Sequence, residues 1–237
     1  MLAVIIPAFN EEKRIGASLS ALCNWTKSSG IACRIIVVSD GSDGTAPISR
    51  RIARKFPKTI KVLQYPVRLG KGGAVMAGLC KCSGMALMYD ADASVGPGQI
   101  PHLLSRLSDA DVVIASRRVR GAGISGNYPL WRHGLSFMFN AYTKLVLGLA
   151  YDDTQCGFKL FSARAAKLLS GYPFTSKGYE WDVEVLLAAK KLGLRVVEIP
   201  VVWKYEEGGK ARAKDLLDMV AGLLRLKLEY GYSKTRK

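Results

Sequence analysis

Asp90 and Asp92 are separated by a single residue, Ala91, and follow directly after the short apolar run 85–89. Carboxylate oxygens are the ligands that magnesium and manganese prefer, and both ions commonly bridge to phosphate groups. One carboxylate suits the ion, the other suits a ribose or a metal-bound water, and the hydroxyl of Ser94 offers a further oxygen. An Asp-x-Asp pair also occurs by chance in solvated turns. The pair alone therefore leaves a metal site and a plain turn both open.

Asp40 lies in a second polar segment, 39–44, which also follows an apolar run. A carboxylate there can accept hydrogen bonds from a nucleobase or a ribose hydroxyl, and Gly41 lets a ligand approach the backbone. Ser42 and Asp43 belong to the residue types that cap helices, so capping is the alternative role for this segment. Both roles are compatible, with Asp40 binding a ligand and Asp43 capping a helix.

Lys71 lies in the glycine-rich turn 68–73. The turn lacks the G-x-x-x-x-G-K-[ST] spacing of a nucleotide-triphosphatase loop and the G-x-G-x-x-G spacing of a dinucleotide site. A basic turn at the start of a helix is still a suitable place for a diphosphate. A solvated lysine in a tight turn explains the same residues, so both interpretations stay open.

The apolar runs that precede these polar segments must position them. Short β-branched runs alternate with amphipathic patterns, which predicts an α/β fold with a parallel sheet covered on both faces. The expected strands are 4–6, 34–38, 61–64, 85–89, 112–115 and 195–199, and the expected helices are 11–27, 45–56, 72–81, 99–107, 128–149, 181–192 and 214–230, with a loop over 152–159. Ligands bind at the carboxyl ends of strands in such sheets. We therefore expect segments 7–12, 39–44 and 90–92 to share one rim.

The chain of 237 residues carries a net charge of +16, which fits phosphorylated molecules, an anionic membrane or a polyanion as partners. Nucleic acid is not expected, because the basic residues are spread along the chain and no nucleic-acid signature is present. The five cysteines have no metal-binding spacing. We expect one domain without a signal peptide. We expect no transmembrane helix either, since the longest apolar stretch, 135–151, contains Asn140 and Lys144.

Four segments taken together, 7–12, 38–45, 70–72 and 90–92, resemble those of glycosyltransferase family 2. Segment 153–161, Asp-Thr-Gln-Cys-Gly-Phe-Lys-Leu-Phe, more closely resembles the dolichyl-phosphate β-glucosyltransferase branch, as do 181–186 and the stretch from 202–203 to 209–210. The resemblance implies the GT-A fold, a Rossmann-like and mostly parallel sheet flanked by helices, with acceptor-side helices toward the C-terminus. On this basis residues 1–237 form a single domain, in which 1–118 would bind the nucleotide sugar and 119–237 the acceptor.

The resemblance also implies a reaction, the inverting transfer of a hexose from a nucleoside diphosphate sugar to dolichyl or polyprenyl phosphate, with Mg²⁺ or Mn²⁺ as cofactor. UDP-glucose is the favoured donor and GDP-mannose the alternative. A transferase with a soluble acceptor and a non-catalytic nucleotide-sugar-binding protein are further alternatives. An acceptor phosphate is already ionised and needs positioning more than a base, so no catalytic base is assigned. The Gln-x-x-Arg-Trp signature of processive synthases is absent.

Carried over position by position, the resemblance assigns the nucleoside to residues that follow or end the first two strands: Pro7, Ala8, Asn10, Glu12 and Asp40. Asp90 would lie near the ribose and Asp92 on the metal. Lys210 and Arg212 would close over the diphosphate, although Lys210 follows Gly208-Gly209 where the family commonly has Gly-Ser. A solvated loop lysine is the alternative for Lys210.

Arg117, after the fifth expected strand, and Arg132, on the apolar helix 128–149, would contact the acceptor phosphate on the same basis. Asp92, Arg132 and Lys210 are thus the expected catalytic residues, although Arg132 also fits a surface arginine whose stem covers apolar neighbours. Members of this branch usually carry an N-terminal membrane anchor, whereas this chain begins at its first strand. The aromatic and cationic residues of helix 129–149, such as Trp131 and Lys144, predict peripheral attachment to an anionic membrane at its cytoplasmic face.

Overall fold

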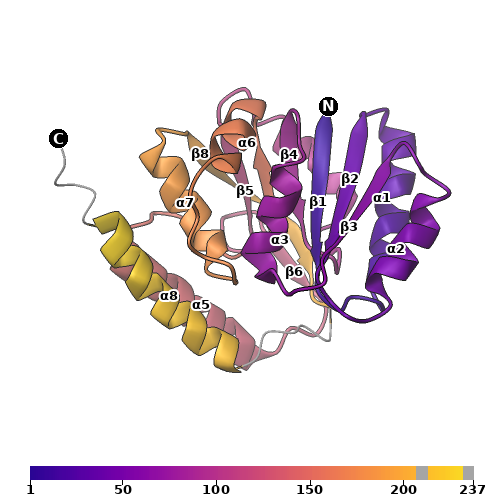
Figure 1. Ribbon diagram of the computed structural model, residues 1–237. Helices are drawn as coiled ribbons and strands as arrows, with labels where there is room; N and C mark the ends of the chain where they lie inside the picture. The colour runs from indigo at the N-terminus through magenta and orange to yellow at the C-terminus, as the bar shows by residue number, and fades with distance from the viewer. Residues whose placement is uncertain (207–212, 232–237) are drawn as a thin grey trace.

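The computed structural model of the chain describes residues 1–206 and 213–231, with the backbone alone for 213–217. A seven-stranded sheet forms its centre, in the order β3-β2-β1-β4-β7-β5-β8 (Figure 1). The strands are β1 (Leu2–Ala8), β2 (Cys33–Ser39), β3 (Ile60–Gln64), β4 (Met85–Tyr89), β5 (Val112–Ser116), β7 (Phe158–Phe161) and β8 (Val196–Pro200), and a second, two-stranded sheet pairs β6 (Gly123–Ser125) with β9 (Val202–Lys204). The mostly parallel α/β architecture confirms the fold class expected from the sequence.

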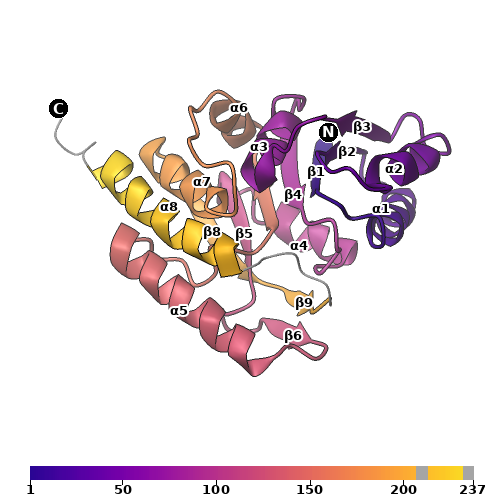
Figure 2. The same ribbon diagram turned by 60° about the horizontal axis from the view of Figure 1, so that its bottom comes forward.

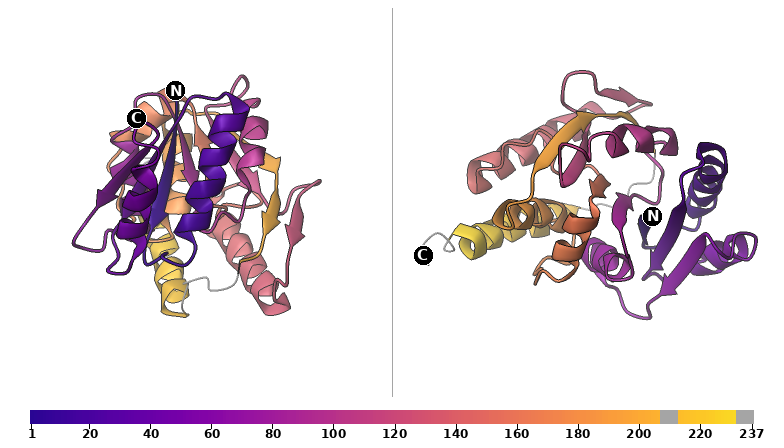
Figure 3. Two further views of the ribbon diagram at one scale, coloured as in Figure 1. Left: turned by 90° about the vertical axis from the view of Figure 1, so that its right-hand side faces the viewer. Right: turned by 90° about the horizontal axis from the view of Figure 1, so that it is seen from above.

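Helices cover both faces of the sheet, as the views in Figure 3 show. They are α1 (Ile15–Ser29), α2 (Thr45–Ala53), α3 (Gly70–Leu79), the short 3₁₀ helix η1 (Pro97–Gln99), α4 (Ile100–Leu104), α5 (Leu130–Leu147), α6 (Ala163–Ser170), α7 (Trp181–Lys191) and α8 (Ala213–Gly231). Alternate side chains of β1 divide between two cores, because Val4 and Ile6 pack with α1 while Ile5 packs with α3. Burial on both faces explains why this strand reads as an unbroken apolar run.

β7 departs from the expected pattern, because it pairs antiparallel with both of its neighbours, β4 and β5. The expected loop over 152–159 is wrong at its last two residues, which begin this strand, and α6, β6 and β9 were not expected at all. β7 has only four residues, and the charged Lys159 interrupts its apolar pattern. Because β7 runs against its neighbours, its first residue lies where they end, and segment 153–157 reaches the carboxyl rim.

α5 and α8 pack against each other and form a pair that extends from the body of the molecule (Figures 1 and 2). In Figure 1 this pair lies below the sheet, on the side toward which the parallel strands point. Among the described residues, no helix combines the length and the apolar character that a crossing of the bilayer takes. The pair is therefore a surface feature beside the rim where ligands are expected.

Candidate functional site

The strand order reverses between β1 and β4, which lie side by side although β2 and β3 intervene in the chain. Open α/β sheets bind their ligands in the crevice at such a reversal. The segments that follow β1, β2 and β4 all leave the sheet at this rim, and segment 153–157 enters it there. The structure thus brings together the polar segments that the sequence analysis selected.

Asn10 and Glu12 join the loop after β1 to the loop after β2. The Asn10 side-chain oxygen accepts hydrogen bonds from the amides of Ser42 and Asp43 at 3.0 and 3.4 Å, and the Glu12 carboxylate accepts one from the amide of Gly44 at 2.9 Å. Pro7 and Ala8 end β1 just before these loops. The four residues shape the rim, and their contact with a nucleoside stays a prediction.

Asp40 is almost fully buried, and one of its carboxylate oxygens holds the glycine-rich turn that begins α3. That oxygen accepts hydrogen bonds from the backbone amides of Leu69 and Gly70, at 2.8 and 3.0 Å. The N-cap of α2 is Gly44 and not Asp43 as expected, but the Asp43 carboxylate one residue earlier still accepts the amide of Thr45, the first residue of α2. Asp40 therefore connects the β2 loop to the turn that carries Lys71.

Asp92 and Ser94 form a tight turn after β4. The Asp92 carboxylate accepts the amide of Ser94 at 3.0 Å and lies 3.9 Å from the Arg14 guanidinium. The intervening Ala93 has a positive φ of 55°, a backbone conformation that is uncommon without glycine. The hydroxyl of Ser94 is buried and has no hydrogen-bond partner within the described residues. A buried oxygen without a partner is a group that a bound ion or water would satisfy.

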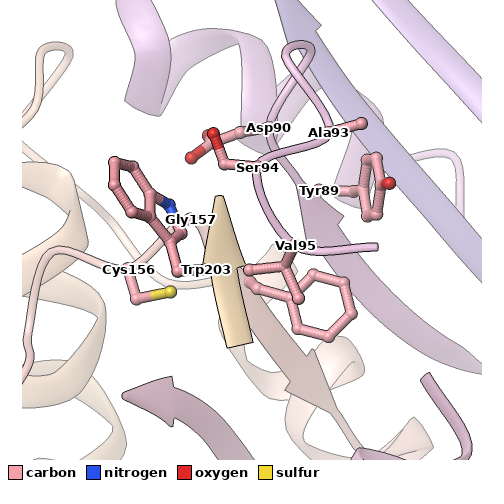
Figure 4. Close-up of a pocket in the computed structure, with 9 residues that line it drawn as sticks. Tyr89, Asp90, Ala93, Ser94, Val95, Cys156, Gly157 and Trp203 are labelled. Atoms are coloured by element: carbon pink, nitrogen blue, oxygen red, sulfur yellow. The ribbon is translucent and has the colours of Figure 1, made fainter. Parts of the chain in front are cut away.

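A small cavity of about 10 Å³ adjoins this turn, with room for about one water. Asp90, Ser94, Gly157 and Trp203 are among the residues that line it (Figure 4). A side chain at Gly157 would collide with Asp90, since a Cβ there would lie 1.8 Å from a carboxylate oxygen. Burial raises the pKa of Asp90, an effect that the nearby Lys71 ammonium opposes. Glycine at 157 is thus what lets segment 153–157 close over the Asp90 carboxylate.

The donors at this turn fit a hard divalent ion. No group of three or more His, Cys, Asp or Glu side chains in residues 1–206 and 218–231 is arranged to hold a metal by itself. Magnesium and manganese sites that bind phosphorylated ligands take only one or two carboxylates from the protein, and the ligand and water complete the shell. Asp90, Asp92 and the unpartnered hydroxyl of Ser94 match that arrangement.

Lys71 extends from the first turn of α3 toward two carboxylates. Its ammonium lies 2.8 Å from Asp182, at the start of α7, and 3.4 Å from Asp90. Burial lowers the pKa of Lys71, but attraction to these carboxylates more than offsets it, so the pKa lies above its ordinary value. Asp182 also contacts Lys159 of β7, and both of these side chains are fully buried. Lys71 is therefore a charged, partnered group beside Asp90, and its contact with a diphosphate stays a prediction.

Arg117 follows β5 and binds Asp153 with two parallel hydrogen bonds, at 2.6 and 2.8 Å. Asp153 is buried, and its backbone amide donates to the carboxylate of Glu198 at 2.7 Å. Two donors of the Arg117 guanidinium are thus committed to this pair, which secures segment 153–157 at the rim. Its contact with an acceptor phosphate stays a prediction, and the pairing with Asp153 was not foreseen.

Arg132 lies at the start of α5, half-buried against aromatic rings. Its guanidinium is 5.1 Å from the ring of Trp131 and 5.7 Å from that of Tyr205, and Tyr205 packs on Trp203 with ring centres 6.1 Å apart. Trp203 in turn lines the cavity beside Asp90. The aromatic residues therefore connect Arg132 to the carboxylate turn. Lys210 and Arg212 lie outside the described residues.

The comparisons with known proteins agree with this geometry. Residues 3–169 match the family model described as glycosyl transferase family 2. This chain belongs to glycosyltransferase family 2. It is 32% identical to a dolichyl-phosphate beta-glucosyltransferase of Trichomonas vaginalis over 95% of this chain and 72% of that protein. It is also 32% identical to an undecaprenyl-phosphate mannosyltransferase of Micrococcus luteus over 88% of this chain and 85% of that protein. The expected family and enzyme class are confirmed.

Solved structures support the fold of this family 2 glycosyltransferase. Glucosyl-3-phosphoglycerate synthase of Mycobacterium tuberculosis, crystallised with Mn²⁺, UDP and phosphoglyceric acid, superposes with a TM-score of 0.69 over 97% of this chain and 78% of that chain, at 21% identity. Its complex with UDP alone gives a TM-score of 0.67 at 22% identity. The fold is GT-A, as the sequence analysis expected.

Sequence reasoning gave no role to several residues that the structure places at the site of this glycosyltransferase, among them Tyr89, Cys156, Gly157 and Trp203. A signal for two of them was present, because Cys156 and Gly157 lie in the segment that carries the closer family resemblance. Trp203 likewise lies in a stretch that carries that resemblance, 202–203, although no role was assigned to it. Tyr89 gave none, because it reads as an ordinary strand residue.

Proposed function

We propose that this glycosyltransferase moves a hexose, with glucose preferred, from a nucleoside diphosphate sugar to a dolichyl or polyprenyl phosphate, with inversion and with Mg²⁺ or Mn²⁺. The observation that carries the proposal is a carboxylate turn at the sheet reversal that is linked, through Trp203, Tyr205 and Arg132, to a helix with an exposed apolar face. The names of the relatives support a lipid phosphate as acceptor. The Mn²⁺ in the neighbouring synthase structure supports a divalent ion.

Asp92 and the Ser94 hydroxyl would hold the ion in this proposal, with Asp90 near the ribose of the donor, and the ion would screen the charge of the diphosphate leaving group. Asn10, Glu12 and the other nucleoside residues would fix the donor at the loops after β1 and β2. The acceptor phosphate needs orientation and charge compensation more than deprotonation, which Arg132 would supply. Lys210 and Arg212 keep their proposed role over the diphosphate.

The exposed face of α5 supports a membrane-bound acceptor. Five large apolar side chains on this helix are more than 60% exposed to solvent: Leu130, Trp131, Phe137, Met138 and Leu145. Leu224 and Leu228 add exposed apolar surface on the adjacent α8. Helices that lie in a membrane interface combine such a face with cations at its edge. The cations of α5 are Arg132 and Lys144, of which Lys144 is paired with Asp152. The phosphate of a lipid acceptor lies at the level of the headgroups. A site next to this helix face can therefore receive the phosphate while the lipid stays in the membrane.

Donor identity is tested by titration. We expect UDP-glucose to bind more tightly than GDP-mannose in isothermal titration calorimetry with Mn²⁺ present, because the segment 153–161 resembles the glucose-transferring branch. Removal of the metal with EDTA should weaken binding of either donor. Transfer to dolichyl or polyprenyl phosphate with each donor completes the test. Tighter binding of GDP-mannose would reassign the donor, and donor binding without transfer to any acceptor would favour a non-catalytic binding protein.

Membrane attachment is tested by co-sedimentation with phosphatidylglycerol vesicles. We expect binding at low salt and release at high salt, because each cation near an anionic leaflet contributes about 1 kcal/mol. Phe137→Glu should reduce vesicle binding several-fold, since it places a charge on the apolar face. Arg132→Glu should reduce both vesicle binding and lipid transfer while donor binding survives. Leu168→Glu, on the exposed side of α6 and away from α5, is the matched control, because it adds the same charge outside the proposed membrane face. Protein that stays in the supernatant at low salt would favour a soluble acceptor.

A further inference from the structure

Four charged side chains form a continuous line from the centre of the sheet to the carboxylate turn. Lys159, in the middle of β7, contacts Asp182 and also donates to the carbonyl of Cys156 at 2.7 Å. The other oxygen of Asp182 lies 2.8 Å from the Lys71 ammonium, which is 3.4 Å from Asp90. Two cations alternate with two carboxylates, so the line is neutral when every group is charged.

Stability alone does not account for this line. Taking a charge out of water is unfavourable, and replacement of a buried ion pair by apolar residues is often neutral or stabilising. Lys159 and Asp182 are both fully buried, yet no reaction step proposed above uses them. Their position suggests what they do, since the line ends at a lysine that faces the carboxylate turn.

The start of α3 is clamped to the segment before α7, which fixes the backbone at both ends of the Lys71–Asp182 pair. The amide of Gly72 donates to the carbonyl of Lys177 at 2.8 Å. A Cβ at Gly72 would lie 2.5 Å from the Cβ of Trp181, so only glycine permits this approach. With both backbones fixed, the direction of the Lys71 side chain depends on the carboxylate that receives its ammonium.

We propose that Lys159 and Asp182 are positioning residues of the donor site: Lys159 orients Asp182, and Asp182 holds the Lys71 ammonium beside Asp90, where it meets the diphosphate of the donor. The inference rests on the proposed function, because it takes a nucleoside diphosphate as the ligand. A free lysine side chain loses conformational entropy when it is ordered. A lysine that is already held loses less on binding, and its charge needs no reorganisation.

The test compares a nucleoside diphosphate with the matching nucleoside, UDP with uridine and GDP with guanosine, by calorimetry in one buffer with Mn²⁺. Only the diphosphate reaches Lys71. We expect Lys71→Met to weaken diphosphate binding about 10-fold or more, as loss of a charged hydrogen bond does, and to leave nucleoside binding unchanged. Lys159→Met should also weaken binding of the diphosphate and leave nucleoside binding unchanged, because the Asp182 carboxylate would no longer be oriented toward Lys71.

Folding is controlled by a paired variant. Lys159→Met alone leaves Asp182 with one partner fewer, whereas Lys159→Met/Asp182→Leu removes both buried charges and keeps the interior apolar. The paired variant should fold, as thermal unfolding will report, and should still lose diphosphate affinity. When the paired substitutions are combined with Lys71→Met, diphosphate affinity should fall little further, because the pair acts through Lys71. Lys167→Met, on the exposed side of α6, is the matched control.

The outcomes separate the inference from the proposed function. If the unmodified protein binds neither UDP nor GDP, the proposed donor class is wrong. If it binds one of them and the paired variant binds it equally well, the positioning role is wrong. Equal losses for diphosphate and nucleoside, or losses that add to that of Lys71→Met, would likewise overturn the inference, because they indicate general damage to the rim.

Discussion

Asp92→Ala is expected to reduce glycosyl transfer at least about 100-fold while the fold persists. The proposed ion contributes several kcal/mol of charge stabilisation to the leaving group, and each 1.36 kcal/mol corresponds to a tenfold change in rate. Within the described part of the chain, the Asp92 carboxylate accepts the local amide of Ser94 and lies 3.9 Å from the Arg14 guanidinium, so its loss should disturb little else. Initial rates with the preferred donor, at saturating Mn²⁺, give the measurement.

Asp109→Ala is the matched control, because this aspartate is exposed and pairs only loosely with Arg106 at 3.8 Å. Its transfer rate should equal that of the unmodified protein. Direct binding of Mn²⁺ in the presence of UDP supplies a readout that does not depend on turnover, and it should be lost in Asp92→Ala alone. A variant at position 92 with ordinary turnover would remove this residue from the metal role.

Asp153→Ala should lower the free energy of unfolding by about 3–5 kcal/mol, the usual cost of leaving a buried charge without its partner. The substitution would leave the largely buried Arg117 side chain, which is 15% exposed, without the carboxylate that binds it twice. Urea unfolding at neutral pH measures the effect. Arg164→Ala, which breaks an exposed pair with Asp111, should cost under about 1 kcal/mol. Equal effects of the two substitutions would contradict a structural role for the buried pair.

The contribution of Asp153 should also depend on pH. Burial raises the pKa of this carboxyl, but attraction and hydrogen bonds from Arg117 more than offset it, so the folded pKa lies below the ordinary value. The unfolded chain then binds the proton more readily than the folded one, and acid favours unfolding. The difference in unfolding free energy between the unmodified protein and Asp153→Ala should be constant above about pH 5 and should shrink below about pH 4. A difference that persists unchanged in acid would contradict this linkage.

The sheet and its rim could be predicted because buried strands have an unmistakable pattern. β1, β2, β4 and β5 are all close to fully buried, so their apolar runs stand out from the amphipathic helices between them. The polar segments that follow three of them then share one edge by topology alone. β7 was not predicted, because a strand of four residues that includes a lysine has no such pattern.

The internal contacts of the site could not be predicted in the same way. Asn10 contacts the amide of Ser42, Asp40 contacts that of Leu69, and Arg117 contacts Asp153, so the partners are 32, 29 and 36 residues apart. No periodicity relates such partners, because their approach depends on the path of the loops. Residue type showed that these side chains were suited to binding a ligand. It did not show which of them already form hydrogen bonds within the protein.

The position of β7 has a consequence for how the chain assembles. β5 ends at Ser116, but its two neighbours in the sheet, β7 and β8, begin only at Phe158 and Val196. As the chain leaves the ribosome, β1 to β4 can pair at once, whereas β5 has to wait for strands that are synthesised later. Pairings between distant segments are also the slow ones. The pairing of β7 that joins β5 to the first four strands is the same step that carries segment 153–157 to Asp90, so the newly made protein cannot form its site before β7 is made.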